Sequence, residues 1–423
     1  MLESAKKIWF YVLSLFFLAA NGILLYNERY EFLGLPVLVL FAYFAIFKLD
    51  VLYYIVLFLV PISINLDDLG IDLGVGIALP TEPLIVGMML IFILKLFFDG
   101  SFDKDVLRHP ITKIIIFHLL WITITTMTSS DPIVSVKFLL SRLWYVSVFF
   151  FIASQVLKSQ QSQKRMIWLY VIGFIPVLVY TFQQHAIRGF DQASANWVMN
   201  PFFNDHTSYG ACLAMVFPFL FWQSFSPKIS GVKRLIVWFV LLLFLIALIL
   251  SYTRAAWVSL VGALGVFIVL RFKIKTWMIV TGVLAVGIFL FTTMDSIFMN
   301  LERNKQDSSS NLTEHVESIS NVSSDASNLE RINRWKSAWE MFQDKPIFGF
   351  GPGTYAFEYA PYQQSKDKTI ISTNAGDGGN AHSEYLGPLS EQGLLGSLFI
   401  VAIVIAVSIS GVKVYKSTLS KES

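Results

Sequence analysis

Residues 234–271 read RLIVWFVLLLFLIALILSYTRAAWVSLVGALGVFIVLR. Apolar residues run almost without interruption on both sides of one internal cation, Arg254. Each run approaches the ~20 residues that a helix needs to cross a bilayer. Because lipid cannot satisfy backbone polar groups, and because these runs do not alternate with polar residues, helices are favoured over barrel strands. The stretch therefore predicts two transmembrane helices joined by a very short turn.

The rest of the chain repeats this pattern. Of its 423 residues, 55% are hydrophobic and 14% are charged, whereas a soluble domain carries ~25% charged residues. Twelve apolar segments are expected at 8–26, 34–48, 51–65, 83–98, 111–127, 135–154, 166–182, 207–225, 234–252, 254–271, 276–293 and 392–411. The second and third are short, so they form either a helical hairpin or one broken span. The predicted fold class is an all-α polytopic membrane protein with about twelve transmembrane helices.

Composition also excludes several classes of protein. The apolar blocks rule out a soluble enzyme, a disordered chain and a nucleic-acid binder, and a net charge of +3 carries no electrostatic signature. A single cysteine, Cys212, excludes a disulfide framework and a cysteine-cluster metal site. The first apolar block lacks a small-residue cleavage site and is read as a retained membrane anchor.

The orientation follows from lysine and arginine in the short loops. With the N-terminus inside, nearly every cytoplasmic loop is basic and the opposite loops contain few cations. We therefore expect both termini to lie in the cytoplasm. This divides the chain into residues 1–293 with eleven spans, an outer loop at 294–391, and residues 392–423 with the last span and a cytoplasmic tail.

The outer loop has three recognisable parts. Residues 304–328 are rich in Ser, Asn, Asp and Glu and predict a flexible surface. Residues 329–342, LERINRWKSAWEMF, place apolar side chains at helical spacing and predict an amphipathic helix that lies on the membrane or caps the bundle. GFGPG at 349–353 is read as a tight turn, because neither a preceding strand nor a following Lys-Ser or Lys-Thr supports a phosphate loop.

Charged residues at the outer membrane edge are the candidate binding groups. Arg254 opposes the positive-inside bias, so a carboxylate, a lipid headgroup or an anionic substrate should stabilise it, unless it is a snorkelling helix-end arginine. Arg188 lies in the outer loop 183–206, where Asp191 or Asp205 could pair with it. NDHTSYGA at 204–211 predicts an outward-facing helix start beside His206, a position suited to phosphate.

His382 is the candidate general base. It lies in NAHSEYLGPLSEQGLLGSLF, where the long outer loop meets the last span, and Glu384 or Glu391 could orient it. Arg331 and Arg334 lie between the apolar positions of the amphipathic helix, as solvated charges or as substrate contacts. Asp67, Asp68 and Asp72 could hold a divalent metal, although three acidic residues in a loop are more often solvated. No metal site is predicted for this chain.

These residues together resemble a known family. SYTRAAW is followed by RINRWKSAWEMFQDKPIFGFGPGTYAF and then by NAHSEYLGPLSEQGLLG, a series similar to that of the O-antigen ligase and polymerase superfamily of bacterial membrane glycosyltransferases. The resemblance covers roughly residues 200–411. Two departures are Ser383, where Asn is frequent, and the insert NAGDGGN before the histidine. The positions that match are Arg254, Arg331 or Arg334, Trp335 or Trp339, Pro346, Gly349, Gly351, Asn380, His382, Leu386, Glu391, Gly393 and Gly396.

The resemblance implies an activity and a location. A GT-C-like enzyme of this kind transfers a glycan from undecaprenyl diphosphate to a lipid A-core or glycan acceptor at the periplasmic face of the bacterial inner membrane, without metal or cofactor and with inversion. Arg188 and Arg254 are expected to bind the diphosphate, and His382 to accept the proton of the acceptor hydroxyl. Further contacts to acceptor or donor are expected from Asn380, Glu384, Arg331, Arg334 and His206.

Three variants of the chemistry and one different class remain open. A ligase, favoured by the motif pattern, a repeat-unit polymerase and an O-linked protein glycosyltransferase differ in the acceptor. A transporter of lipid-linked glycans would instead need charged residues deep in several spans, and His118 and Arg142 are the main exceptions to otherwise uncharged spans.

Overall fold

The computed structural model is almost entirely helical. It describes residues 2–27, 34–70, 76–100, 102–275, 277–293 (apart from 283, 286, 290 and 291), 326–365, 368, 372 and 379–422. Residues 304–325 of the predicted flexible stretch therefore lie outside the described residues. Asp72 and residues 374–378 of the insert before the histidine lie outside them as well. The apolar segment 276–293 is only partly described.

The helices follow the apolar segments. The α-helices of the first half are α1 (Leu2–Tyr26), α2 (Leu35–Phe47), α3 (Leu49–Leu59), α4 (Thr81–Asp99), α5 (Lys104–Arg108), α6 (Pro110–Met127), α7 (Pro132–Val146), α8 (Ala153–Val156) and α9 (Gln160–Ile187). Those of the second half are α10 (Gln192–Ala195), α11 (His206–Ser224), α12 (Gly231–Leu250), α13 (Arg254–Arg271), α16 (Ala326–Asp344), α17 (Tyr355–Glu358) and α18 (Leu386–Glu422).

Short elements complete the chain. A π-helical segment, η4 (Ser147–Ile152), joins α7 to α8, and three 3-10 turns are η2 (Val60–Ile62), η3 (Asp67–Leu69) and η5 (Ala360–Tyr362). The two-residue strands β1 (Ile64–Asn65) and β2 (Ala78–Leu79) pair antiparallel, with Ile64 opposite Leu79. Asp67 and Asp68 form the turn η3 beside this hairpin.

Seven helices in the described residues are long and apolar enough to cross a membrane. They are Thr81–Phe98, Pro110–Met127, Pro132–Val156, Gln160–Ile187, Gly231–Leu250, Arg254–Arg271 and Leu386–Thr418. The chain is thus an all-α protein of multi-pass membrane type, and the figure of twelve spans stays a prediction. The second and third segments form two helices, because the backbone leaves helical geometry at Lys48 (φ −144°, ψ 56°).

Side-chain caps fix where several helices begin. Asp131 accepts hydrogen bonds from the amides of Ile133 and Val134 before α7, and Pro132 suits the first helical position because it has no amide hydrogen to satisfy. Asp205 accepts the amide of Ser208 at 2.8 Å, which confirms the helix start predicted at 204–211.

Hydrogen bonds between loops define two ends of the helical bundle. At the first end, Ser130 donates its amide to the carbonyl of Phe350, and Tyr252 donates its hydroxyl to the carbonyl of Phe190. At the second end, Lys158 forms an ion pair with Asp103 at 2.9 Å, between the loops that precede α5 and α9. Loops distant in sequence therefore meet at each end, as alternating spans require.

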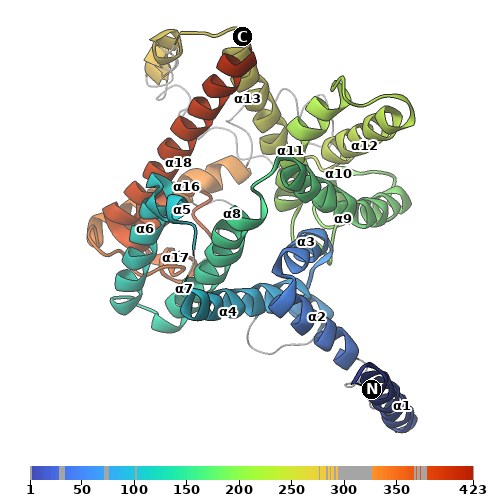
Figure 1. Ribbon diagram of the computed structural model, residues 1–423. Coiled ribbons are helices and arrows are strands. Elements are labelled where there is room, and N and C mark those ends of the chain that lie inside the picture. Colours follow the sequence, from blue (N-terminus) through green and yellow to red (C-terminus); the bar gives the residue numbers. More distant parts are fainter. Residues whose placement is uncertain are drawn as a thin grey trace.

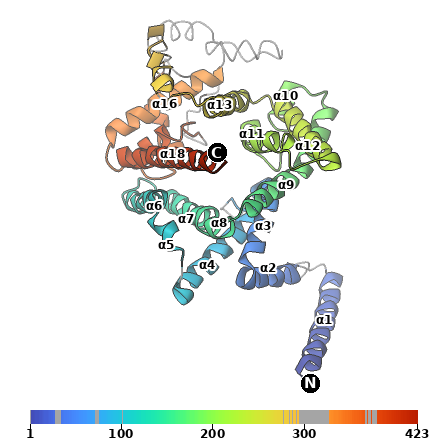
Figure 2. The same ribbon diagram turned by 45° about the horizontal axis from the view of Figure 1, so that its top comes forward.

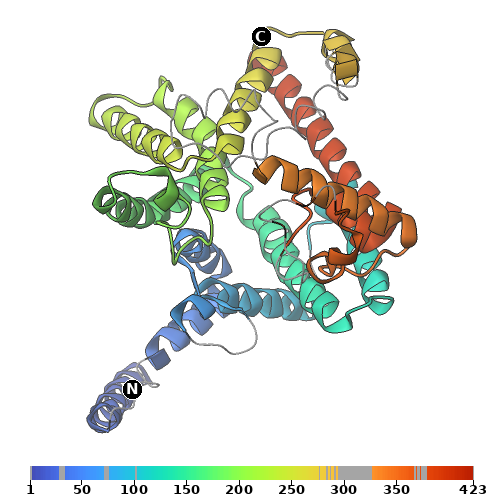
Figure 3. The same ribbon diagram turned by 180° about the vertical axis from the view of Figure 1, so that it is seen from behind.

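The helices form two groups (Figure 1). One group contains α9 to α13, and its buried core centres on Phe174, Tyr209 and Phe244. The other contains α6 to α8 together with α16 to α18, and α2 to α4 lie below both groups while α1 projects away from them (Figures 1 and 2). Seen from behind, α16 lies across the second group against the beginning of α18 (Figure 3).

A break in α18 fixes the loop that follows α16. Gly393 has φ 69° and ψ −169°, which ends the first turns of α18 before its long apolar part begins. A side chain at Gly393 would meet the carbonyl oxygen of Ile347 at 2.0 Å. Two backbone hydrogen bonds lie in the same region. The amide of Leu394 donates to the carbonyl of Pro346, and the amide of Phe350 donates to the carbonyl of Ser390. The predicted turn at 349–353 is confirmed, and it packs on this break.

Candidate functional site

The loop before α18 presents His382 in a fixed conformation. Its backbone has φ 46°, in the left-handed region that few non-glycine residues occupy. The amide of His382 donates to Oδ1 of Asn380 at 2.9 Å. Ser383, where the family often has Asn, accepts the amide of Leu386 at 3.1 Å and so caps α18. The departure from the family pattern therefore has a structural role beside the histidine.

Arg334 on α16 contacts this loop directly. Its Nη1 lies 3.3 Å from Nε2 of His382 and donates to the carbonyl of Asn380 at 3.2 Å. Since a guanidinium has donors and no acceptor, Nε2 must accept, and the imidazole is therefore neutral with its proton on Nδ1. Nε of Arg334 also donates to Oε1 of Glu330 at 2.8 Å, in an ion pair whose side chains are 12% and 4% exposed.

The face of α16 that packs against the rest of the protein combines polar side chains with the fully buried, apolar Ala338 and Met341. Glu330, Asn333 and Ser337 are buried, whereas Trp335 and Trp339 are 41% and 49% exposed. The helix predicted over residues 329–342 is present within α16 and packs against α18, but the two tryptophans of its predicted apolar stripe do not form the covered face. Polar partners in the following loops help to explain the difference, because they form hydrogen bonds with the buried side chains of Glu330 and Asn333.

Several side chains form this support. Asn333 donates to Gln363 at 2.9 Å, and Ser372 donates to Glu330. Tyr355 donates its hydroxyl to the carbonyl of Arg334 at 2.8 Å, and its ring stacks on Tyr359 at a centroid distance of 5.0 Å. The Arg334 guanidinium also lies 5.7 Å from the centroid of the Tyr359 ring. Arg334 is therefore held from three sides before any substrate arrives.

The N-terminus of α11 faces the same cluster. Partial burial and the charges of Arg334 and Arg331 lower the pKa of His382, against the opposing charges of Glu330 and Asp205. Burial also lowers the pKa of His206, with Asp205 opposing and Arg331 reinforcing this effect. The charge of Arg331 thus acts on both histidines, which indicates that the loop of His382 and the start of α11 both lie near this part of α16.

Arg254 begins α13 close to this helix start. The preceding residue, Thr253, donates its hydroxyl to the carbonyl of His206 at 2.7 Å. A side chain at Gly210 would meet Thr253 at 2.7 Å, so glycine is what allows α11 and α13 to approach this closely. The backbone of Arg254 is therefore next to His206, as the prediction of a shared outer site requires.

Arg188 is engaged elsewhere. Its Nη1 donates to the backbone carbonyl and to the side chain of Gln184 at 2.7 and 2.9 Å, and its guanidinium lies 4.4 Å from the ring centroid of Trp197. Neither predicted acidic partner is used, because Asp191 caps α10 and Asp205 caps α11. The described contacts therefore do not join Arg188 to the His382 cluster.

The acidic residues near His382 also have other contacts. Glu391 accepts the backbone amide of Tyr355 at 3.1 Å, so it fixes the turn after GFGPG. Glu384 is exposed, and the side chain that contacts the imidazole is Arg334. Sequence reasoning missed the carboxylate that does support the site, Glu330, although its i, i+4 spacing from Arg334 is a recognisable ion-pair signal.

The two polar exceptions within the spans have structural partners. Nε2 of His118 lies 3.1 Å from Oε1 of Gln392, which joins α6 to α18, and the guanidinium of Arg142 lies 5.0 Å from the Phe138 ring centroid. The contact of His118 packs two helices together, whereas that of Arg142 lies within α7 itself. They give no support to a polar path through the protein.

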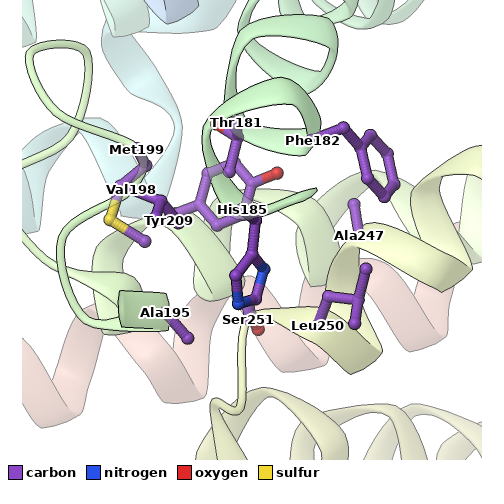
Figure 4. Close-up of a pocket in the computed structure, with 10 residues that line it drawn as sticks. All are labelled: Thr181, Phe182, His185, Ala195, Val198, Met199, Tyr209, Ala247, Leu250 and Ser251. Carbon is purple, nitrogen blue, oxygen red and sulfur yellow. The ribbon is translucent and has the colours of Figure 1, made fainter. Parts of the chain in front are cut away.

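A small cavity near the first end is too small for a sugar. It lies between α9, α11 and α12, and His185 and Tyr209 point into it (Figure 4). Its volume is about 10 Å³, which is roughly what one water molecule needs. Nε2 of His185 donates to the carbonyl of Asp191 at 2.8 Å, so this histidine has a structural partner.

Comparison with known families gives one match, over part of the chain. Residues 239–401 match the family model described as O-antigen ligase. The resemblance to the O-antigen ligase and polymerase superfamily is confirmed over this segment. The match contains Arg254, all of α16 and His382, and it leaves out Arg188 and His206. No curated protein and no solved structure matches the chain. Family and helices together indicate a multi-pass membrane protein of glycosyltransferase type, with lipid-linked glycans and membrane lipids as its partners.

Proposed function

We propose that this protein is an O-antigen ligase-type glycosyltransferase. It transfers a glycan from undecaprenyl diphosphate to a sugar of the lipid A-core at the periplasmic face of the inner membrane, without a metal. The observation that carries the proposal is the Arg334–His382 contact, which lies within the matched segment and beside Arg331 and the start of α11. Cations and a titratable base at one membrane edge are what this transfer requires.

The cations have a role in binding and in the departure of the leaving group. Arg254 and Arg331 bind the diphosphate through the forked donors of their guanidinium groups, and the N-terminus of α11 adds a favourable dipole. As the bond from the anomeric carbon to the diphosphate oxygen breaks, its electron pair leaves with the diphosphate. Fixed positive charge at that position stabilises the transition state more than the ground state.

His382 takes the proton of the acceptor hydroxyl as its oxygen attacks the anomeric carbon. In the free protein Nε2 accepts a hydrogen bond from Arg334, and neighbouring cations disfavour the imidazolium. A bound diphosphate neutralises these cations and competes for the donors of Arg334. Donor binding thereby frees the lone pair on Nε2 and raises the proton affinity of the imidazole, so the base becomes active when the donor is present.

The contribution of Arg188 is smaller in this proposal than the sequence suggested. Its donors are directed to Gln184 and its guanidinium to Trp197. Asn380 holds the loop of His382, and His206 lies beside Arg331 as a further contact to donor or acceptor. A polymerase and an O-linked protein glycosyltransferase use the same groups, and the acceptor distinguishes them.

The test compares surface glycans with lipid-linked intermediates in a strain that lacks the gene, complemented with wild type or with His382→Ala. The ligase proposal expects polymer to accumulate on the polyprenyl carrier while the lipid A-core stays bare, in the deletion and in the variant. A core with a single repeat unit would identify a polymerase. Unchanged glycans in the deletion strain would reject glycan transfer and bring the transporter class forward.

A further inference from the structure

A cavity of about 490 Å³ opens at the second end of the bundle, between α3, α4, α8 and the beginning of α9. These helices lie together in Figure 2. Arg165 lines this cavity near the start of α9, whereas Arg188 follows the end of that helix. Their separation of 23 positions corresponds to roughly 35 Å along a helix, at 1.5 Å per residue. The cavity therefore lies far from the first end of the bundle, where the loop after α9 contacts Tyr252.

The cavity carries more positive than negative charge. Its lining contains Lys95 and Arg165 with one carboxylate, Asp50. Within the part of the chain that the structure describes, neither cation has a carboxylate within ion-pair distance. The Arg165 guanidinium lies 5.4 Å from the ring centroid of Tyr54, which positions it on the cavity wall. Two cations without paired acids favour an anionic ligand of the phosphate type.

The surroundings of the cavity are apolar on the side of α4. Beside Lys95, Leu94 is 50% exposed, and Phe97 and Phe98 are 82% and 85% exposed. A soluble phosphate compound would gain nothing from this surface, whereas acyl chains can cover it. A volume near 490 Å³ is also within the range of small-molecule sites, which is ~300–1,000 Å³.

The position of the cavity agrees with the charge distribution of the loops. Lys48 precedes α3, and Lys158, which pairs with Asp103, lies in the loop between α8 and α9, so further lysines lie in the loops at this end. By the positive-inside bias this end faces the cytoplasm. Basic pockets between transmembrane helices on that side bind the headgroups of anionic lipids.

We propose that this cavity binds an anionic membrane lipid. Lys95 and Arg165 contact the headgroup phosphate, and the acyl chains lie along the exposed face of α4. The site is independent of glycan transfer at the opposite end, and its occupancy is measured by binding alone.

The experiment measures lipid binding to the purified full chain. Native mass spectrometry counts cardiolipin bound to protein released from nanodiscs of phosphatidylcholine with added cardiolipin. The double variant Lys95→Gln with Arg165→Gln should bind cardiolipin about 30-fold more weakly, because each cation near the surface contributes ~1 kcal/mol to binding an anionic lipid. The matched control is Lys164→Gln, since Lys164 instead lies 5.1 Å from the Trp222 ring centroid, and it should stay within about twofold of wild type.

Two further measurements test the folding of the double variant and the need for positive charge at Arg165. Thermal unfolding without added lipid should show the double variant folded, and Arg165→Lys should retain most of the binding. Equal cardiolipin binding by wild type and the double variant would reject the site. Stabilisation of the wild type by inorganic phosphate alone, absent in the double variant, would reject the lipid and identify a soluble phosphate ligand.

Discussion

Replacing His382 by Gln and by Ala separates two roles that the imidazole can have. Its Nε2 accepts a hydrogen bond from Arg334 at 3.3 Å, so the ring could orient that arginine as well as accept a proton. Glutamine offers an acceptor oxygen to Arg334 but does not take up a proton near neutral pH. Alanine removes both properties.

The structure sets the size of each effect. A hydrogen bond from a charged donor contributes about 1.5–3 kcal/mol, and this one is longer than the usual range and partly exposed. Loss of this hydrogen bond should therefore cost about 1.5 kcal/mol of transition-state stabilisation, which is roughly a tenfold change in rate. Loss of general-base assistance removes about 10²–10⁴ in rate, so it outweighs loss of orientation.

The assay is single-turnover transfer from a polyprenyl-diphosphate glycan donor to acceptor, with the purified chain in detergent. Both variants should lose at least about 100-fold, and Gln should exceed Ala by no more than about tenfold. If His382→Gln stays within about tenfold of wild type, the ring orients Arg334 and is not the base. Circular dichroism and thermal unfolding of both variants provide the control for folding.

Three other substitutions test the surroundings. Because burial and the charges of Arg334 and Arg331 lower the pKa of His382, kcat/KM should fall on the acid side below pH ~6.5. Arg331→Gln should raise this pKa and move the acid limb to higher pH, and an unmoved limb would contradict the charge coupling. Glu330→Gln leaves a nearly buried guanidinium without its anion and should cost about 3 kcal/mol of stability, measured by denaturation in detergent; a change below ~1 kcal/mol would show that the pair is dispensable. Gly393→Ala places a methyl group on a residue with positive φ and against a backbone carbonyl, so it should lower the unfolding temperature. Gly411→Ala is the control on the same helix and should not lower it, because a side chain there meets open space. Equal unfolding temperatures of the two variants would contradict the packing described for the break in α18.

Much of the fold could be predicted from the sequence because membrane helices obey local rules. Apolar length predicts the spans, and the cap at Asp205 follows from residue type and spacing. The pattern in residues 329–342 likewise predicts a helix at the correct place. Motif spacing also located His382 and Arg254 within the segment that the family comparison later matched.

The tertiary structure decided which of these groups meet. Helical periodicity places Arg331 and Arg334 on neighbouring positions of α16, but it does not determine which one reaches His382. That choice depends on loops some 20 to 40 residues away, which cover Glu330 and Asn333 and leave Trp335 exposed.

The sequence by itself therefore determined where the helices lie and which residue types are available at the candidate site, and the sidedness of the helices stays a prediction. Only the tertiary structure assigned Arg334 to His382, turned Arg188 toward Trp197 and gave Glu391 a backbone partner. The physical reason is the distance along the chain over which each interaction acts. Hydrophobic length and capping act within one or two turns of a helix, whereas the partner of a charged side chain depends on segments that meet only when the chain has packed.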